Sequence, residues 1–332
     1  MAIAPDYLAT NDINIYWKDE ATLGVDEAVA TGWTHIRPTS FTIPEVHGDI
    51  EESALQAGRL TQNIKNVVHR NDTAVKTFDL TLKGDATAID WVMKYCIEST
   101  AEPKILPYYY NFPDMKDGAN AGNSFKILFH NSAYHPSGYF EHIELVGCII
   151  TGFTIGQSID AENGECVITA NCMSGYKPEY ITQTITSPTA IPTTAPYNIK
   201  DNDTFNINDG TAEDLMIYSW ELTASRPVER IGCKDYTDFK PFGYAMSGAW
   251  EVSGALVVKR DSEVQSLVAQ FNGTATCDIN IGKASSGLLI DIPTAYLNGE
   301  IDSGGSFLKQ NISFKAYSST NSAGNLFAIT TG

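Results

Sequence analysis

Several residue patterns that would assign a function directly are missing from this chain. The spacing of its cysteines fits neither a disulfide framework nor a zinc site. Most of them fall on apolar faces, where a free cysteine behaves as a small buried hydrophobe, so we expect reduced thiols and folding in the cytoplasm. The six cysteines are Cys96, Cys148, Cys166, Cys172, Cys233 and Cys277.

Targeting and membrane signals are missing as well. The first ten residues contain neither a basic segment nor an apolar core, so we expect no signal peptide. No apolar run approaches the roughly 20 residues that a membrane-spanning helix needs. We therefore expect no membrane partner.

Basic residues are scarce. The chain has 22 Lys and Arg against 40 Asp and Glu, which gives a net charge of −18. Nucleic-acid-binding proteins neutralise phosphates with Lys and Arg, so a conventional DNA-binding domain is disfavoured. An acidic surface repels DNA, although ordinary solubility charge explains most of these carboxylates equally well.

Motifs for catalysis, cofactors or metals are also missing. Three histidines lie close in sequence, but their spacings of five and seven residues match no common zinc pattern. In the acidic stretch 201–214, a calcium loop aligned on Gly210 would need Phe205 as its first ligand, and phenylalanine has no oxygen to offer. Gly152 and Gly156 do not form a dinucleotide fingerprint. We therefore expect no enzyme, no cofactor and no metal. The three histidines are His130, His135 and His142.

What the chain does contain is the same strand–helix pattern twice. Residues 76–95 (KTFDLTLKGDATAIDWVMKY) align without a gap to residues 253–271 (SGALVVKRDSEVQSLVAQF). In each segment an alternating strand ends at Lys-x-Asp and passes directly into a helix. Asp85 and Asp261 are the predicted N-caps, because an aspartate carboxylate accepts from the free N–H groups of a first helical turn.

The elements around this pattern recur in the same order. An opening strand precedes it, and after the helix come a strand, a longer apolar stretch, an acidic turn with glycine and a closing alternating strand. We therefore predict a mainly β protein with one packed helix in each half. The matching segments are 35–46 and 217–229, 87–97 and 263–272, 125–129 and 277–281, 143–155 and 288–301, and 165–172 and 310–317.

The repeated order divides the chain into two domains, which is the number expected for a chain of 332 residues. The segment between them is rich in Thr and Pro, so we expect an extended, fairly stiff linker. The expected boundaries are an N-terminal arm at 1–32, a first domain at 33–175, a linker at 176–212, a second domain at 213–318 and a polar C-terminal tail at 319–332.

Both domains carry a long polar insertion at the same position, 44–75 in the first and 226–247 in the second. Long loops without structure of their own are uncommon in compact domains and are usually functional. A shared role is one interpretation, and two unrelated variable loops are the alternative.

This order of elements resembles the tail tube proteins of long-tailed phages and related viruses. The resemblance rests on the opening strand with its long loop, on the strand–helix segment 76–95, on the stretch 146–155 (VGCIITGFTI) and on the closing strand after an acidic turn. It covers about 33–175 and 213–318. The second copy departs from the pattern at 290–294, where the Gly-rich segment is missing.

The resemblance implies two tandem tail-tube-type β-sandwich domains, each with one flanking α-helix. Six such domains in a ring join their inner sheets into a closed barrel, and rings stack into a tube through which the viral DNA passes without specific binding. With two domains per chain, three chains complete a ring, so we expect a homotrimer with pseudo-hexameric symmetry. The implied partners are further copies of this chain and the tail completion and tape-measure proteins, and the implied location is the virion tail.

In such a tube, the long insertions would contact the adjacent ring, and the polar faces of the inner strands would line the lumen. The expected inter-ring residues are Glu45, Asp49, Glu51, Glu52, Arg59, Arg226, Glu229, Arg230, Lys234 and Asp235. The expected lumen residues are Asp79, Glu144, Glu221 and Glu251.

Three other functions fit the same sequence. One is a two-domain β-sandwich binding or adhesion module, another is the tube protein of a bacterial contractile injection machine, and the third is a β-sandwich hydrolase with a hidden carboxylate pair. The size of the native protein separates them, because a tube protein forms rings or polymers whereas an adhesin or hydrolase stays small.

Overall fold

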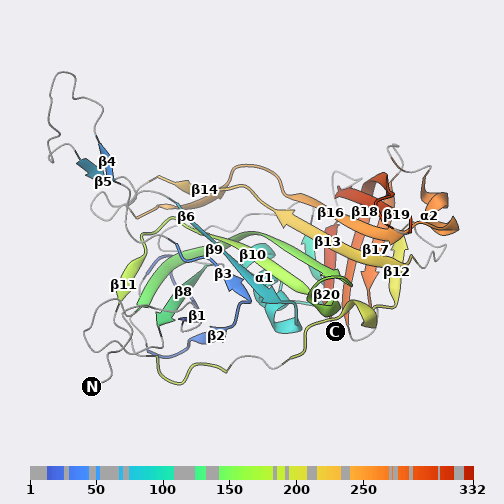
Figure 1. The fold of residues 1–332 in the computed structure, drawn as a ribbon. Coiled ribbons are helices and arrows are strands. Elements are labelled where there is room, and N and C mark those ends of the chain that lie inside the picture. The colour runs from blue at the N-terminus through green and yellow to red at the C-terminus, as the bar shows by residue number, and fades with distance from the viewer. Residues whose placement is uncertain are drawn as a thin grey trace.

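The protein is an elongated, mainly β molecule (Figure 1). Its fold comes from a computed structural model, and the predicted mainly β class is confirmed. Two α-helices are found in the part of the chain that the structure describes. The described residues are 13–25, 30–44, 50–52, 67–69, 75–107, 124–131, 142–181, 185–190, 194–207, 215–232, 240–268, 271, 276–283, 287–305, 307–317 and 325–332.

The first group of strands forms around one 17-residue strand, β9. The pairing order is β8–β9–β10–β6–β3, and every pair is antiparallel. The strand β8 pairs with β9 as far as Cys148, and β10 pairs with it from Ile149 onward. The bounds are β3 (Ser40–Phe41), β6 (Lys76–Lys83), β8 (Phe125–Asn131), β9 (His142–Ser158) and β10 (Val167–Ser174).

Three further strands extend this group. The first, β1, lies in the segment predicted as an N-terminal arm and pairs with β8 and with β2. The third strand, β11, comes from the segment predicted as a linker and pairs with the beginning of β9. The bounds are β1 (Ile13–Asp19), β2 (Thr34–Ile36) and β11 (Glu179–Ile181).

The second group has the pairing order β13–β16–β19–β18–β17, with β12 outside β17. Its long strand is β18, which pairs with β17 through its first part and with β19 through its second. The bounds are β12 (Thr204–Ile207), β13 (Ile217–Ser225), β16 (Glu251–Lys259), β17 (Cys277–Gly282), β18 (Leu288–Asp302) and β19 (Lys309–Ala316).

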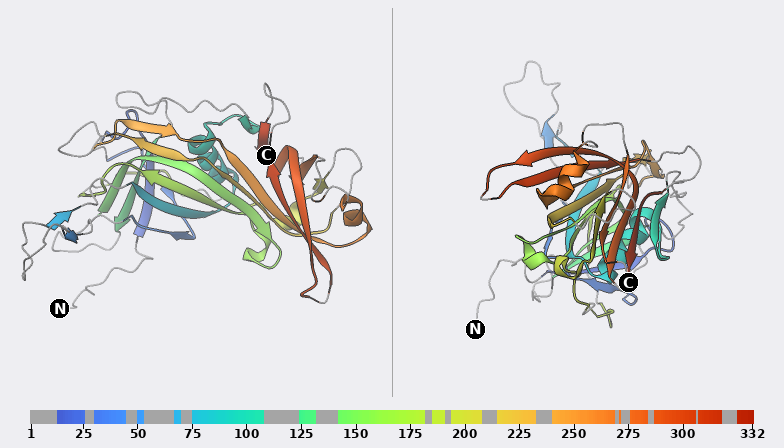
Figure 2. Two further views of the ribbon diagram at one scale, coloured as in Figure 1. Left: turned by 90° about the horizontal axis from the view of Figure 1, so that it is seen from above. Right: turned by 90° about the vertical axis from the view of Figure 1, so that its right-hand side faces the viewer.

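One strand pairing joins the groups into one continuous sheet, so the strands run on from one half of the molecule into the other (Figure 2). The strand β13 of the second group pairs with β9 of the first. The C-terminal strand β20 (Asn325–Thr331) pairs both with β18 and with β7 (Lys104–Pro107). The expected polar tail is therefore wrong for Asn325–Thr331, because four apolar residues here, 326–329, are buried in the core.

Both long insertions contain a β-hairpin, so they are not structureless loops. The first carries β4 paired with β5, and the second carries β14 paired with β15. The β4–β5 hairpin projects from the body of the molecule in Figure 1. The bounds are β4 (Ile50–Glu52), β5 (Val67–His69), β14 (Val228–Ile231) and β15 (Gly243–Met246).

Each predicted helix begins at its predicted cap. The Asp85 carboxylate accepts from the backbone N–H of Ala88 at 2.8 Å, at the start of α1 (Ala86–Ile97). The Asp261 carboxylate accepts from the N–H of Val264 at 3.3 Å, at the start of α2 (Ser262–Leu267). The second helix is shorter than predicted because the N–H of Val268 bonds to the carbonyl three residues earlier, which closes the last turn.

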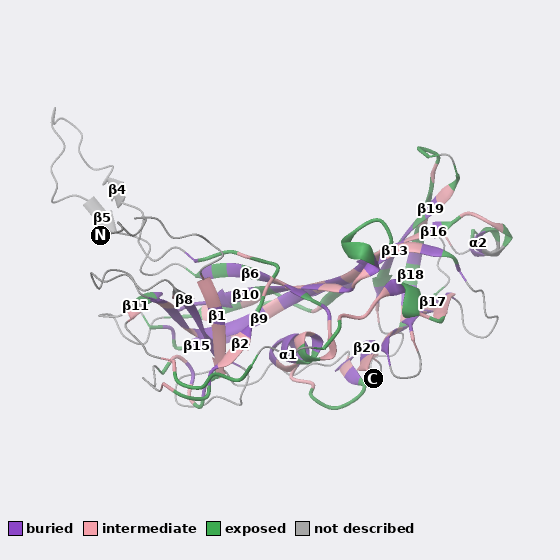
Figure 3. Cartoon of the chain, turned by 60° about the horizontal axis from the view of Figure 1, so that its bottom comes forward, coloured by how far each residue is buried: buried purple, intermediate pink, exposed green. Residues whose placement is uncertain are grey.

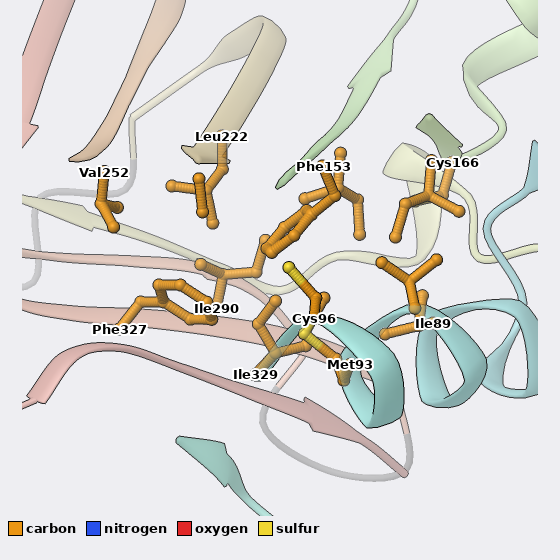
Figure 4. Close-up of a cluster of buried hydrophobic side chains, with 14 of the residues drawn as sticks. Ile89, Met93, Cys96, Phe153, Cys166, Leu222, Val252, Ile290, Phe327 and Ile329 are labelled. Atoms are coloured by element: carbon orange, nitrogen blue, oxygen red, sulfur yellow. The ribbon is translucent and has the colours of Figure 1, made fainter. Parts of the chain in front are cut away.

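One hydrophobic core runs through both groups of strands. Figure 4 shows Phe153 of β9 in one cluster with Met93 and Cys96 of α1 and with Phe327 and Ile329 of β20. The rings of Phe153 and Phe327 meet edge to face with their centroids 5.8 Å apart. Five cysteines are free and buried, as predicted, and Cys233 lies outside the described residues. The five are Cys96, Cys148, Cys166, Cys172 and Cys277.

We predict that Phe153→Ala lowers the free energy of unfolding by about 3–5 kcal/mol, because it leaves a cavity where the two groups of strands meet. Phe153 is fully buried. Phe153→Leu should cost less, since it keeps most of the volume. Denaturant unfolding of both variants measures the difference. A loss of less than 1 kcal/mol for Phe153→Ala would show that the two groups do not depend on this contact.

Candidate functional site: the polar face of the continuous sheet

The pairing of β13 with β9 forms the seam between the two groups of strands. It runs from Ser219 opposite Ser158 to Ser225 opposite Gly152. Side chains alternate along β13, so that Trp220, Leu222 and Ala224 are buried in the core. Figure 3 shows buried positions along β9 as far as β13. The seam is therefore apolar on one face and polar on the other.

Two glycines of β9 allow the close approach of β13. A Cβ added at Gly152 would lie 2.7 Å from the carbonyl oxygen of Ala224, and one added at Gly156 would lie 2.6 Å from that of Trp220. Both distances are shorter than real Cβ contacts. These glycines formed no nucleotide-binding motif in the sequence. Their structural role is to let another strand's backbone come close.

A row of threonines crosses the polar face. The register places Thr223, Thr154, Thr169 and Thr81 side by side on β13, β9, β10 and β6. The hydroxyls of Thr223 and Thr154 are 3.0 Å apart, and those of Thr169 and Thr81 are 3.1 Å apart. Cross-strand hydroxyl pairs of this kind stabilise a sheet and leave its surface uncharged.

Three of the four expected lumen residues lie on this polar face. Asp79, Glu221 and Glu251 are exposed, and the register puts each of them on the same side of the sheet as the threonine row. The side-chain amide of Asn171 donates to the Asp79 carboxylate at 3.0 Å. The three side chains thus lie on the polar face of the sheet, and their place in a lumen stays a prediction.

The fourth residue, Glu144, corrects the expectation. Its side chain is buried, and its carboxylate lies 3.6 Å from the Lys126 ammonium, which is buried too. Glu144 precedes Gly147, whose φ of +60° breaks the strand alternation near an irregularity in the β8–β9 register. A simple alternation counted through Gly147 therefore assigns Glu144 to the wrong face.

The charges on the polar face have both signs. Lys83 forms an ion pair with Glu165 at 2.6 Å, and Lys315 lies 3.7 Å from Glu251. Over the seam the face has a shallow depression, with Gln157 and Glu221 among its lining residues. Exposed pairs of this kind contribute little to stability, so their effect is on the electrostatic potential of the surface.

Arg226 is one expected inter-ring residue that the structure places elsewhere. Its guanidinium is buried and donates to the carbonyls of Tyr95 at 3.3 Å and Ile150 at 2.9 Å. It also lies over the ring of Trp250, at 5.5 Å. Arg226 therefore fixes the start of the second insertion inside its own chain and is not free to contact another ring.

The other expected inter-ring residues divide into two sets. Four of them lie in the two hairpins, Glu51 and Glu52 in β4 and Glu229 and Arg230 in β14. Outside the described residues lie Glu45, Asp49, Arg59, Lys234 and Asp235.

The β14–β15 hairpin is anchored on the first group of strands by Tyr244. Its buried hydroxyl donates to the Gly147 carbonyl at 2.7 Å and accepts from the Gly175 N–H at 2.7 Å. A small second core surrounds this tyrosine. No local pattern of residues indicates this contact, because the two partners are 97 and 69 residues away from Tyr244.

Two of the three clustered histidines meet on neighbouring strands. His130 and His142 are cross-strand partners, and their rings stack at 3.9 Å. The ring of Tyr16 lies edge-on to His130 at 5.6 Å. Burial, and secondly the neighbouring imidazole of His142, lower the pKa of His130 to about 4. His135 lies outside the described residues.

Neither a metal site nor a membrane span is found in the described part of the chain. No group of three or more His, Cys, Asp or Glu side chains there could hold a metal ion. None of the helices in that part combines the length and apolar composition that a membrane crossing requires.

Comparison with known proteins gives no family. No protein-family model matches the chain, and no curated protein matches it either.

We predict that Arg226→Ala lowers the free energy of unfolding by about 2 kcal/mol or more, because two buried carbonyls lose a charged donor. Glu229→Ala, three residues along in β14 and exposed, is the control and should change stability by less than about 0.5 kcal/mol. Denaturant unfolding compares them. Equal effects would contradict the anchoring role of Arg226.

We also predict that the histidine stack makes stability depend on pH. Because the folded pKa of His130 lies below the unfolded value of about 6.5, the unfolded state binds more protons as the pH falls. Stability is therefore fully present above about pH 6.5 and is lost progressively toward pH 4. His130→Asn should flatten this part of a melting-temperature profile. A profile of His130→Asn that keeps the wild-type slope would contradict this assignment.

Proposed function

We propose that the chain is a structural subunit of a virus tail tube, which assembles into stacked rings for genome delivery. The observation that carries this proposal is the strand order. The first group reads β3–β6–β10–β9–β8, and the second reads β13–β16–β19–β18–β17. In each group the second of these strands runs directly into a helix, and the fourth is the longest.

The aligned strand residues are also in similar surroundings, since each is buried and pairs with a buried residue of the next strand. Leu80 pairs with Ala170 in the first group, and Leu256, its aligned counterpart, pairs with Ile312 in the second. We infer from this correspondence that the chain consists of two tandem tail-tube-type β-sandwich domains. The alternation of a buried and a polar face in the shared sheet supports the same reading.

The way the two units join supports assembly. The first strand of the second unit adds to the long strand of the first, so edge-to-edge joining of these units already occurs within one chain. The same joint between two chains would be a head-to-tail contact. Such contacts close into a ring when the rotation from one chain to the next divides a full turn evenly. Three chains of two units each would give a pseudo-hexameric ring without free sheet edges.

The polar face is suited to line the lumen. Its threonine row is neutral, and Asp79, Glu221 and Glu251 add exposed carboxylates beside paired lysines. DNA carries one negative charge per ~1.7 Å of its axis, so carboxylates on the wall would weaken its binding. The same face also carries Lys259 and Lys309, which are cross-strand partners on β16 and β19. Repulsion would act over about one Debye length, roughly 8 Å at physiological salt.

The assembly itself is the primary test. Native mass measurement should give trimers, and electron microscopy of the purified protein should show rings or hollow tubes. A protein that stays monomeric at every concentration would favour an adhesion module or a hydrolase. Rings of six chains would contradict the trimer.

The lumen assignment has its own test. Asp79, Glu221 and Glu251 are exposed, so replacing all three with lysine should leave the fold intact. We expect assembled tubes of this variant to retain DNA on a filter and wild-type tubes to retain none. The control replaces Glu179, Asp201 and Glu229, which are exposed and lie off this face, with lysine. If both triple variants retain DNA equally, the face does not line the lumen.

A further inference from the structure

Two edges of the continuous sheet are open. The strand β3 ends the pairing order, with β6 on one side only. The second part of β18 pairs with β19 on one side, and no described strand pairs with its other side. An open edge exposes backbone N–H and C=O groups that can pair with another chain.

The seam inside the chain shows what fits the open edge of β18. Across the first unit, one row of cross-strand partners is Leu82, Ile168, Ile155 and Leu222, on β6, β10, β9 and β13. The corresponding row of the second unit is Val258, Gln310 and Ile301, on β16, β19 and β18, and it stops there. Ile301 therefore occupies the place of Ile155 without a partner strand.

The residue that would pair with Ile301 can be identified at the open edge of β3. Trp220 of β13 pairs with Leu256, and Phe41 of β3 pairs with Leu80, which aligns with Leu256. Two residues beyond Trp220 along β13 is Leu222, and two residues beyond Phe41, just past the end of β3, is Ile43. Ile43 therefore corresponds to the residue that pairs with Ile155 in the seam.

Exposure of these side chains agrees with this assignment. In the seam, Ile155 and Leu222 are 0% and 1% exposed. Their counterparts Ile301 and Ile43 are 55% and 37% exposed. Large aliphatic side chains at two unfilled ends of one repeating pattern are what a repeat of the same joint would bury.

We propose that the segment directly after β3, residues 42–44, pairs antiparallel with residues 300–302 at the open edge of β18 of a second copy, and that Ile43 lies opposite Ile301. This inference rests on the proposed function and specifies its ring contact. The neighbouring residues are compatible with the register, which places Thr42 opposite Asp302. In β18, Asn298 and Asp302 stand at the places that Gly152 and Gly156 occupy in β9. The register of the seam can therefore repeat between chains, but the two backbones would not come as close as they do at the two glycines.

The same repetition gives the β4–β5 hairpin a place. It follows β3 as the β14–β15 hairpin follows β13, and the β14–β15 hairpin packs on the unit to which β13 pairs. A β3 strand paired with a neighbour would carry its hairpin onto that neighbour within the ring. The β4–β5 hairpin, which projects from the body in Figure 1, would then pack against the adjacent chain of the same ring.

Cross-linking tests the register. Ile43→Cys and Ile301→Cys chains, co-expressed as two single variants, should form covalent dimers with a short bis-maleimide, and neither variant alone should do so. Thr42→Cys with Ile301→Cys is the control, because a one-residue shift turns the side chain to the other face of the sheet. Denaturing gels measure the yield, and we expect at least a fivefold preference for the Ile43 pair.

A charge at the joint tests its energetic role. Ile301→Asp should raise the concentration needed for association at least tenfold and leave the melting temperature of the monomer unchanged. Ile159→Asp is the matched control, since Ile159 is 52% exposed and lies outside the proposed joint. An unchanged association of Ile301→Asp, or an equal loss in both variants, would overturn the proposal.

The outcomes separate this inference from the proposed function. If wild-type protein forms tubes but the Ile43 pair does not cross-link preferentially, the register is wrong and the tube assignment stands. If the pair cross-links but only open chains form, the joint is right and the tube assignment fails. A protein that never associates overturns both.

Discussion

The backbone pairing of β13 with β9 is the constraint on which the rest of the structure depends. It adds the first strand of the second group to the long strand of the first, so two sets of antiparallel strands become one sheet. Gly152 and Gly156 make the approach possible, because a side chain at either position would meet the carbonyls of β13. The pairing also buries Leu222 and Ile155, which extends one core through both halves. Without it, β9 and β13 would each carry an open edge here, which is the feature that natural sheets cover or close.

Several features of the molecule follow from this joint. The sheet keeps one apolar face, on which α1 and the C-terminal strand β20 pack, and one polar face with its threonine row. The second insertion crosses the joint as a hairpin, and Arg226 and Tyr244 fix it to the first group. The second insertion is expected from the sequence to be a long polar loop. It instead contains a hairpin that holds the two groups of strands together. The polar face, which carries no buried catalytic arrangement in the described residues, is the surface that the proposed tube uses.

In the proposed tube, the joint within the chain is the template for contacts between chains. A repeating unit that satisfies one edge and leaves the equivalent edge open has the geometry of a head-to-tail polymer. Non-directional hydrophobic burial alone would not specify a ring, because it does not fix a register. Antiparallel backbone pairing does fix it, since a shift of one residue turns every side chain to the opposite face.

The sequence by itself determined the elements of this protein. Period-two alternation located β6, β10, β16 and β19, and Asp85 and Asp261 marked the two helix starts, because these signals depend on neighbouring residues alone. It also singled out Asp79, Glu221 and Glu251, which lie on the polar face of the sheet. Tertiary structure alone decided that β13 pairs with β9, that Glu144 and Arg226 are buried, and that the C-terminal residues form a core strand. The physical reason is that each of these outcomes depends on contacts between segments far apart in the chain, or on a local break such as the positive φ of Gly147, which no periodic pattern records.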